Sequence, residues 1–186
     1  MINLRLCSLL FLSAVVISAD AANVRAPTLI SGGEIHFVGK VISLPCRIAP
    51  GDERIPVDFK DIALKDLFSN GKTKPIPFTI HLLDCNTVVF NSVTVKFSGN
   101  ESTKLPGRLT ITAVDGGDMT AVGVGLQTLE GQPIELDKDA LVAALSEKSM
   151  SLDFSAFVEG DITALKEGKV DLGRFTSTAN YTLSYQ

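Results

Sequence analysis

The chain has 186 residues, which is the length of one ordinary domain. Hydrophobic residues make up 45% of it and charged residues 20%, a balance that excludes an intrinsically disordered chain. The 17 basic side chains against 21 acidic ones give a net charge of −4 without a long basic run. We therefore expect no nucleic-acid partner.

Residues 1–21 have the features of a secretory signal peptide. A short start with one positive charge precedes an almost wholly apolar run over residues 6–17, and small residues occupy the positions that signal peptidase recognises. We expect cleavage after Ala21, with cleavage after Ala22 as the near alternative. An uncleaved anchor is disfavoured because the apolar run is too short to cross a bilayer comfortably, so we predict no stable membrane span.

The cysteine count predicts one disulfide in the exported chain. Cys7 leaves with the signal peptide, so that only Cys46 and Cys85 remain. Two cysteines in an exported protein favour a disulfide over thiol chemistry. A catalytic or metal-binding cysteine is the competing interpretation, but no C-x-x-C spacing occurs and no histidine lies close to Cys46 in the sequence.

Short segments of alternating polar and apolar residues predict an all-β domain. They lie between clusters of Gly, Pro, Asn and Asp, as strands of a β-sandwich do. Two glycines in the fifth segment, Gly123 and Gly125, predict bulges or close backbone approach. In chain order the predicted strands are 35–38 with 41–42, 77–82, 93–97, 109–114, 121–129, 152–158 and 175–185.

One segment departs from this pattern. Residues 139–148 contain good helix formers, and Leu141, Ala144, Leu145 and Lys148 have helical spacing. We predict a single short helix in a connection there. A partner-binding amphipathic helix is the sharper alternative, but the apolar face is too small to favour it.

The two ends of the exported chain have complementary patterns. Residues 175–186 alternate up to the last residue, so the edge of that strand needs a partner for its main-chain groups. Residues 22–44 contain a second alternating stretch that has no evident partner. The two segments could pair with each other within one chain, or each could pair with a neighbouring molecule.

Several segments together resemble the pilin subunits of chaperone–usher fimbriae in Gram-negative bacteria. The resemblance covers essentially the whole exported chain, in order and at plausible spacing. The stretch over residues 137–149 is longer than the usual connection in this family. The matching segments are 33–42 with Pro45-Cys46, 77–85, 95–99, 121–126 and the terminal Phe175, Ala179-Asn180-Tyr181 and Tyr185-Gln186.

The resemblance implies an incomplete immunoglobulin-like β-sandwich of six strands that lacks its last, seventh strand. A periplasmic chaperone would first lend a strand, and the N-terminal extension of a neighbouring pilin subunit would then replace it at the outer-membrane usher. The chain would be exported through the periplasm into a fimbrium on the cell surface. The domain organisation would be a signal peptide over 1–21, a donor-strand extension over 22–44 and a pilin domain over 45–186.

The resemblance also assigns roles to individual residues. The donor strand would present Ile35, Phe37, Gly39 and Val41, and Gly39 would mark the place where no side chain fits. Tyr181, Leu183, Tyr185 and the carboxylate of Gln186 would form the strand that the chaperone and usher engage. Cys46 and Cys85 would form the family's disulfide between the first two strands.

A secreted enzyme and a secreted ligand-binding β-sandwich without a fibre role are the alternatives. For an enzyme, His36 and His81 are the only imidazoles, and each lies inside an alternating segment. No nucleophile-elbow, zinc-protease or phosphate-loop motif occurs. Asp115 and Asp118 lie in a glycine-rich turn and offer too few oxygen ligands for calcium. We therefore predict no catalytic residue, no metal and no cofactor.

Overall fold

The computed structural model describes residues 31–41 and 45–186. The predicted signal peptide over 1–21, the beginning of the predicted extension and residues 42–44 lie outside the described residues. The chain divides into two units, Met1–Val41 and Ile42–Gln186, and each is described by itself.

In the first unit, residues 31–41 contain neither helix nor strand. Their apolar side chains face solvent, and Phe37 retains 90% of its accessible surface. The alternation that predicted a strand over 35–38 is therefore present without a hydrogen-bonded strand in this segment.

The second unit is a β-domain with two short helices. Ten strand segments lie within residues 45–186, compared with the six strands that the resemblance implies; three of the ten contain only two residues each, and seven are longer. In chain order the elements are β1 (Arg47–Ile48), α1 (Leu64–Asn70), β2 (Ile76–Cys85), β3 (Ser92–Gly99), β4 (Leu109–Ala113), β5 (Asp118–Thr128), β6 (Pro133–Ile134), β7 (Asp139–Ala144), β8 (Lys148–Gly160), α2 (Ile162–Lys166), β9 (Phe175–Thr176) and β10 (Ala179–Tyr185).

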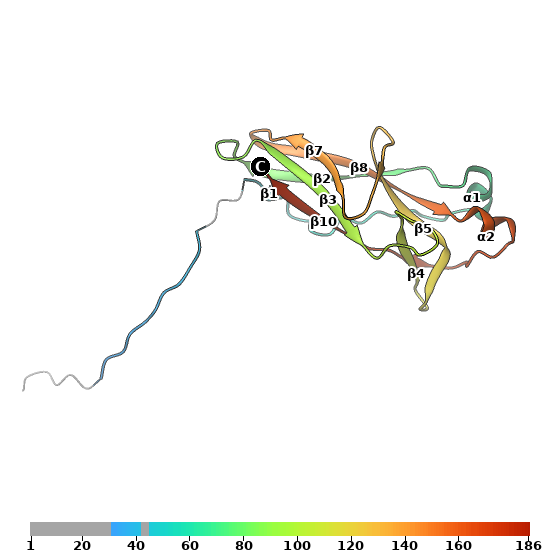
Figure 1. Cartoon of the computed structure of the whole chain (residues 1–186), viewed down its shortest axis with the longest axis horizontal. Helices are drawn as coiled ribbons and strands as arrows, with labels where there is room; N and C mark the ends of the chain where they lie inside the picture. Colours follow the sequence, from blue (N-terminus) through green and yellow to red (C-terminus); the bar gives the residue numbers. More distant parts are fainter. Residues whose placement is uncertain (1–30, 42–44) are drawn as a thin grey trace, which may run out of the picture. The chain divides into compact units, whose positions relative to one another are not determined.

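The strands form two antiparallel sheets that enclose one hydrophobic core. The larger sheet has the order β1-β2-β8-β5-β4-β9, with β6 also paired to β5, and the smaller sheet has the order β10-β3-β7 (Figure 1). Phe97 of the smaller sheet meets Phe154 of the larger one edge-to-face at 5.0 Å between ring centroids. The longer strands contribute apolar residues of one face to this core, as the period-two pattern predicted.

Turn residues explain where several strands end. Gly116 and Gly117 have φ angles of 97° and 86°, which glycine adopts without a steric penalty. They lie in the turn between β4 and β5, and the sequence predicted a turn at this place. The two helices contact each other at the end of the domain opposite to the C-terminus (Figure 1).

The helix predicted over residues 139–148 is wrong. Residues 139–144 form β7, which pairs antiparallel with β3 so that Leu141 lies opposite Val95. Leu141, Ala143 and Leu145 are half-buried against the core, whereas Val142 and Ala144 are exposed. The open edge of β3 provides main-chain partners along its length, and this tertiary pairing overrides the local helix propensity.

The strand predicted over residues 175–185 is two strands in different sheets. β9 pairs with β4 in the larger sheet, and β10 pairs with β3 in the smaller one. The chain crosses between the sheets at Ser177 and Thr178, and the hydroxyl of Ser177 donates to the main-chain oxygen of Thr110 at 2.8 Å. Alternation continues through the crossing, so the sequence pattern alone does not reveal it.

The predicted disulfide between Cys46 and Cys85 is confirmed. It joins the residue before β1 to the last residue of β2, and both cysteines are buried. No helix within the described parts of the chain is long and apolar enough to cross a membrane.

Candidate binding groove

Strand β10 has one unpaired edge. On its other edge it pairs with β3 over its whole length, from Ala179 opposite Gly99 to Tyr185 opposite Val93. Among the described residues, no strand pairs with the free edge of β10. Its outward main-chain groups therefore form a template for one more strand.

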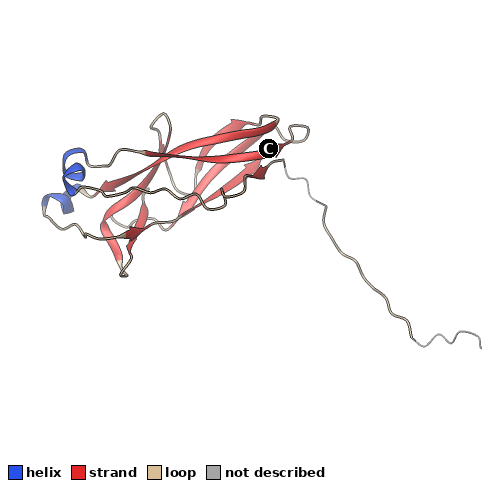
Figure 2. Ribbon diagram, turned by 180° about the vertical axis from the view of Figure 1, so that it is seen from behind, coloured by secondary structure: helices blue, strands red, loops and turns tan. Residues whose placement is uncertain are grey.

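An extended segment without strand pairing lies between β1 and α1. Residues 55–63 have neither helix nor strand, and Figure 2 shows this long stretch in tan. Ile55, Val57 and Phe59 are half-buried against the core, and the residues between them are exposed. The segment has the alternation of a strand but lacks the partner that would make it one.

A groove of about 1570 Å³ separates this segment from the chain that leads into β10. Two continuous runs form its walls, residues 53–62 on one side and residues 170–181 on the other. The floor consists of apolar side chains from both sheets, which are the same residues that form the core: Phe78, Phe97, Leu109, Met119, Val122, Val124, Leu126, Ala156 and Val158.

The rim of the groove carries exposed apolar side chains. Leu172 keeps 79% of its accessible surface and Val114 keeps 62%, although both line the groove. An opening that leads directly onto core side chains and has an apolar rim is typical of an interaction site. The space between the two walls thus lacks one layer of apolar packing.

One end of the groove is closed by hydrogen bonds. The phenol of Tyr181 donates to the main-chain oxygen of Asp52 at 2.8 Å. The Asp52 carboxylate accepts the main-chain N–H of His81 at 2.6 Å, and this bond holds the pKa of Asp52 below its usual value. Burial raises the pKa of Tyr181, which further favours the protonated hydroxyl that donates this bond.

The residues that the resemblance assigned to the final strand occupy different places along β10. Tyr181 lines the groove, whereas Leu183 and Tyr185 pack against the core beyond its closed end. The main-chain oxygen of Gln186 accepts the N–H groups of Asn91 and Ser92 at 2.6 and 2.9 Å. The four residues assigned to the donor strand, Ile35, Phe37, Gly39 and Val41, belong to the first unit, which is described by itself.

Sequence reasoning missed the wall formed by residues 53–62. The alternation of Ile55, Val57 and Phe59 was the signal that could have found it, because it marks a half-buried extended segment. Pro56 and the charged residues around it obscured this pattern.

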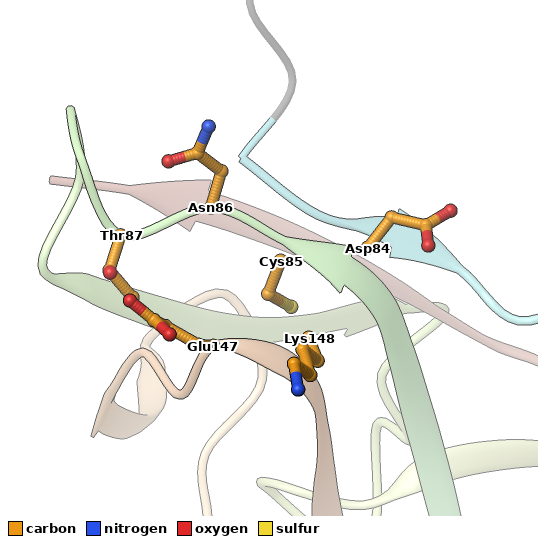
Figure 3. Close-up of a pocket in the computed structure, with 6 residues that line it drawn as sticks. All are labelled: Asp84, Cys85, Asn86, Thr87, Glu147 and Lys148. Atoms are coloured by element: carbon orange, nitrogen blue, oxygen red, sulfur yellow. The ribbon is translucent and has the colours of Figure 1, made fainter.

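A second hollow of about 430 Å³ lies beside the disulfide (Figure 3). Polar side chains dominate its lining, and Figure 3 shows Asp84 pointing away from Glu147 and Lys148. No group of three or more potential metal ligands occurs within the described ranges. The apolar groove therefore remains the candidate site.

Comparisons with known proteins identify the family of the chain. The sequence profile of the Fimbrial protein family matches residues 35–186. The chain is 34% identical over 161 residues to PmfF, a fimbrial subunit of Proteus mirabilis (strain HI4320), covering 87% of this chain and 88% of that one. It is 30% identical over 154 residues to the Fimbria A protein of Serratia marcescens, with 83% and 84% covered.

The crystal structure of the P pilus rod subunit PapA has the same fold. It superposes with a TM-score of 0.65 at 21% sequence identity, and the match covers 77% of this chain and all of PapA. The groove, the unpaired edge and the family match agree with one another. The chain therefore belongs to the Fimbrial protein family, as a chaperone–usher pilin whose immunoglobulin-like sandwich lacks a strand.

Proposed function

We propose that the groove receives residues 33–41 of another subunit's N-terminal extension. Pilins of this family are structural subunits of surface fimbriae that are exported through the periplasm, with a chaperone, an usher and neighbouring subunits as partners. The proposal assigns the insertion of one subunit's extension into another subunit to particular residues of this chain. The observation that carries it is the unpaired edge of β10 beside an open apolar groove.

The geometry of the groove supports an extended occupant. A strand laid between the two walls can form main-chain hydrogen bonds with β10, and its alternate side chains point down to the floor. The wall spans residues 53–62 and the proposed donor spans residues 33–41, so the two segments are similar in length. This arrangement is the strand-addition mode of recognition.

The chemistry of the extension supports the same assignment. Ile35, Phe37 and Val41 would point to one face of an extended strand, and all three are exposed in the first unit. Burial of a phenylalanine alone stabilises by roughly 1.5–3 kcal/mol. Gly39 would lie over the part of the groove that has no depth for a side chain.

The end of β10 has a separate role in this proposal. Tyr181, Leu183, Tyr185 and Gln186 form the strand that the chaperone and the usher engage. Their alternate side chains pack on the core, which leaves the outward main-chain edge accessible to a partner.

The proposed domain organisation follows the same division of roles. Residues 1–21 form a signal peptide that is removed on export, residues 22–44 form the donor extension and residues 45–186 form the receiving domain. The separation of the chain into units at Val41 and Ile42 supports the last boundary to within a few residues. Mass spectrometry of the exported subunit should find its N-terminus at Ala22 or next to it.

We further propose that the subunit acts structurally and not as an enzyme. The family consists of structural fimbrial subunits. The chain has two imidazoles. Nε2 of His36 lies 3.5 Å from Oε1 of Glu34 in the exposed extension. Nδ1 of His81, a residue of β2, lies 2.9 Å from Oδ2 of Asp52.

The substitution Gly39→Arg tests the donor assignment. It should block polymerisation and leave the chaperone complex intact, because the chaperone contacts the groove and not the extension. Lys40→Ala changes the neighbouring residue, which points to the opposite face, and should polymerise normally. Loss of the Gly39→Arg chaperone complex would refute the assignment, since residues 33–41 would then be an internal strand of their own domain.

A further inference from the structure

Tyr181 and Asp52 join the two walls of the groove across 129 residues of sequence. The phenol of Tyr181 donates to the main-chain oxygen of Asp52 at 2.8 Å. Tyr181 is the last residue of the wall formed by 170–181, and Asp52 immediately precedes the wall formed by 53–62. The bond therefore lies at the same end of both walls.

The main-chain oxygen of Asp52 is held in place from β2. The Asp52 carboxylate accepts the His81 main-chain N–H at 2.6 Å and lies 2.9 Å from His81 Nδ1. The N–H of Ala49 donates to the main-chain oxygen of His81 at 2.9 Å, and the N–H of Asp52 donates to that of Ala49 at 3.0 Å. These bonds fix the turn that presents the acceptor for Tyr181.

Alternation of apolar and polar residues does not by itself determine the register in which an inserted strand pairs with β10. A shift by one residue turns the apolar side chains outward and is excluded by that cost alone. A shift by two residues keeps Ile35, Phe37 and Val41 on the same face, so alternation does not exclude it. A fixed end of the groove would block such a shift.

We propose that Asp52, His81 and Tyr181 form a clasp that sets the register of the inserted strand. This inference rests on the proposed function, because it concerns the strand that the groove receives. The three act as positioning residues: the clasp closes the groove at its β1 end, and the other end lies toward helices α1 and α2. The clasp also separates the groove from Leu183 and Tyr185.

Photo-cross-linking of the chaperone-held subunit measures this register. The probe is a synthetic peptide of residues 31–44 with a photoreactive benzoylphenylalanine in place of Lys40. Mass spectrometry identifies which residue of the groove walls it joins. The wild-type subunit should give one dominant position, and Tyr181→Phe should also give positions two residues away. Loss of one neutral hydrogen bond should reduce the preference for the dominant position about fivefold.

Two further variants separate the clasp from a general effect on folding. Asp52→Ala removes the anchor to His81 but keeps the main-chain acceptor, and it should broaden the register in the same direction. Tyr185→Phe removes a hydroxyl from the same face of β10 beyond the clasp and should leave the single position unchanged. The chaperone complex of Tyr181→Phe should keep its melting temperature, which excludes a disordered groove as the cause.

The outcomes distinguish the clasp from the function on which it rests. If the wild-type subunit takes up the peptide and both clasp variants keep the single register, the clasp is refuted and the proposed function stands. If Tyr185→Phe broadens the register as much as Tyr181→Phe does, the clasp is likewise refuted. If the wild-type subunit takes up no peptide, the proposed function fails, and the clasp fails with it.

Discussion

The ring of Phe157 occupies the space where a side chain at Gly125 would lie. A Cβ built on Gly125 would be 2.6 Å from Cε2 and 2.9 Å from Cε1 of that ring. Lys72 Nζ lies 4.8 Å and Arg108 Cζ 5.3 Å from the centroid of this ring, which is within the range of cation–π contacts. Gly125 in β5 and Phe157 in β8 are also cross-strand partners, so the contact joins two central strands of the larger sheet.

Gly125→Ala should therefore destabilise the domain. Because the ring is held in place, we expect the free energy of unfolding to fall by about 1–3 kcal/mol through overpacking. Urea unfolding should be followed in a self-complemented subunit, in which a copy of residues 31–44 follows Gln186 through a flexible linker. The same substitution in a Phe157→Leu background should cost less, and an equal cost in both backgrounds would contradict the contact.

A strand and a helix over residues 139–144 would bury different members of a pair of adjacent alanines. Ala143 is half-buried and Ala144 is exposed, whereas helical spacing would place Ala144 on the apolar face with Leu141. Ala143→Asp should lower the free energy of unfolding by about 1–3 kcal/mol, because it places a charge against the core. Ala144→Asp should be nearly silent in the same urea titration. The reverse order would indicate a helix.

Strands with a clear period of two were predictable from the sequence. Residues 77–82, 93–97 and 152–158 all lie inside observed strands, because one face of each contributes to the core. The glycine prediction in β5 is also confirmed at Gly125, where the backbone approaches an aromatic ring. The local sequence reveals the position of such a strand because every second residue is apolar and packs in the core.

The rest of the fold depends on partners that lie far away in the sequence. Residues 139–144 form a strand because β3 offers an edge, and residues 55–63 stay unpaired because no strand of the described chain lies beside them. The Tyr181 to Asp52 bond joins two segments that no local pattern connects. Burial of the predicted final strand was foreseeable, but its division between two sheets was not.

Removal of the disulfide should cost a large part of the stability. Cys46 and Cys85 are 39 residues apart, and closing a loop of that length restricts the unfolded chain. The chain-entropy estimate is about 4 kcal/mol. Replacing both cysteines with serine in the self-complemented subunit should lower the urea midpoint accordingly, and an unchanged midpoint would show that the cross-link adds nothing to this domain.

The stability of the domain should decrease in acid partly through Asp52. The hydrogen bond from the His81 main-chain N–H lowers the pKa of the folded carboxyl below its usual value of 3.8. A lowered folded pKa means that this contribution is present above about 3.8 and is lost as the pH falls through the folded value. Exposed Asp58 and Glu130, whose pKa values are also lowered, contribute in the same direction.

Asp52→Asn isolates the Asp52 contribution because the other carboxyls remain in both proteins. In self-complemented subunits, the urea midpoint of the wild type should fall more steeply than that of Asp52→Asn between pH 4 and pH 2. Parallel curves would show that the Asp52 carboxylate gains nothing from its contacts with His81.

Amide hydrogen exchange in β10 tests most directly whether residues 33–41 fill the groove. Every second main-chain N–H between Ala179 and Tyr185 faces away from β3, because the bonding direction alternates along an antiparallel strand. In the self-complemented subunit we expect slow exchange at every β10 residue that lines the groove, Ala179 to Tyr181, since the appended strand bonds to the free edge as far as the clasp. Fast exchange at alternate residues, with protection only on the side of β3, would contradict this expectation.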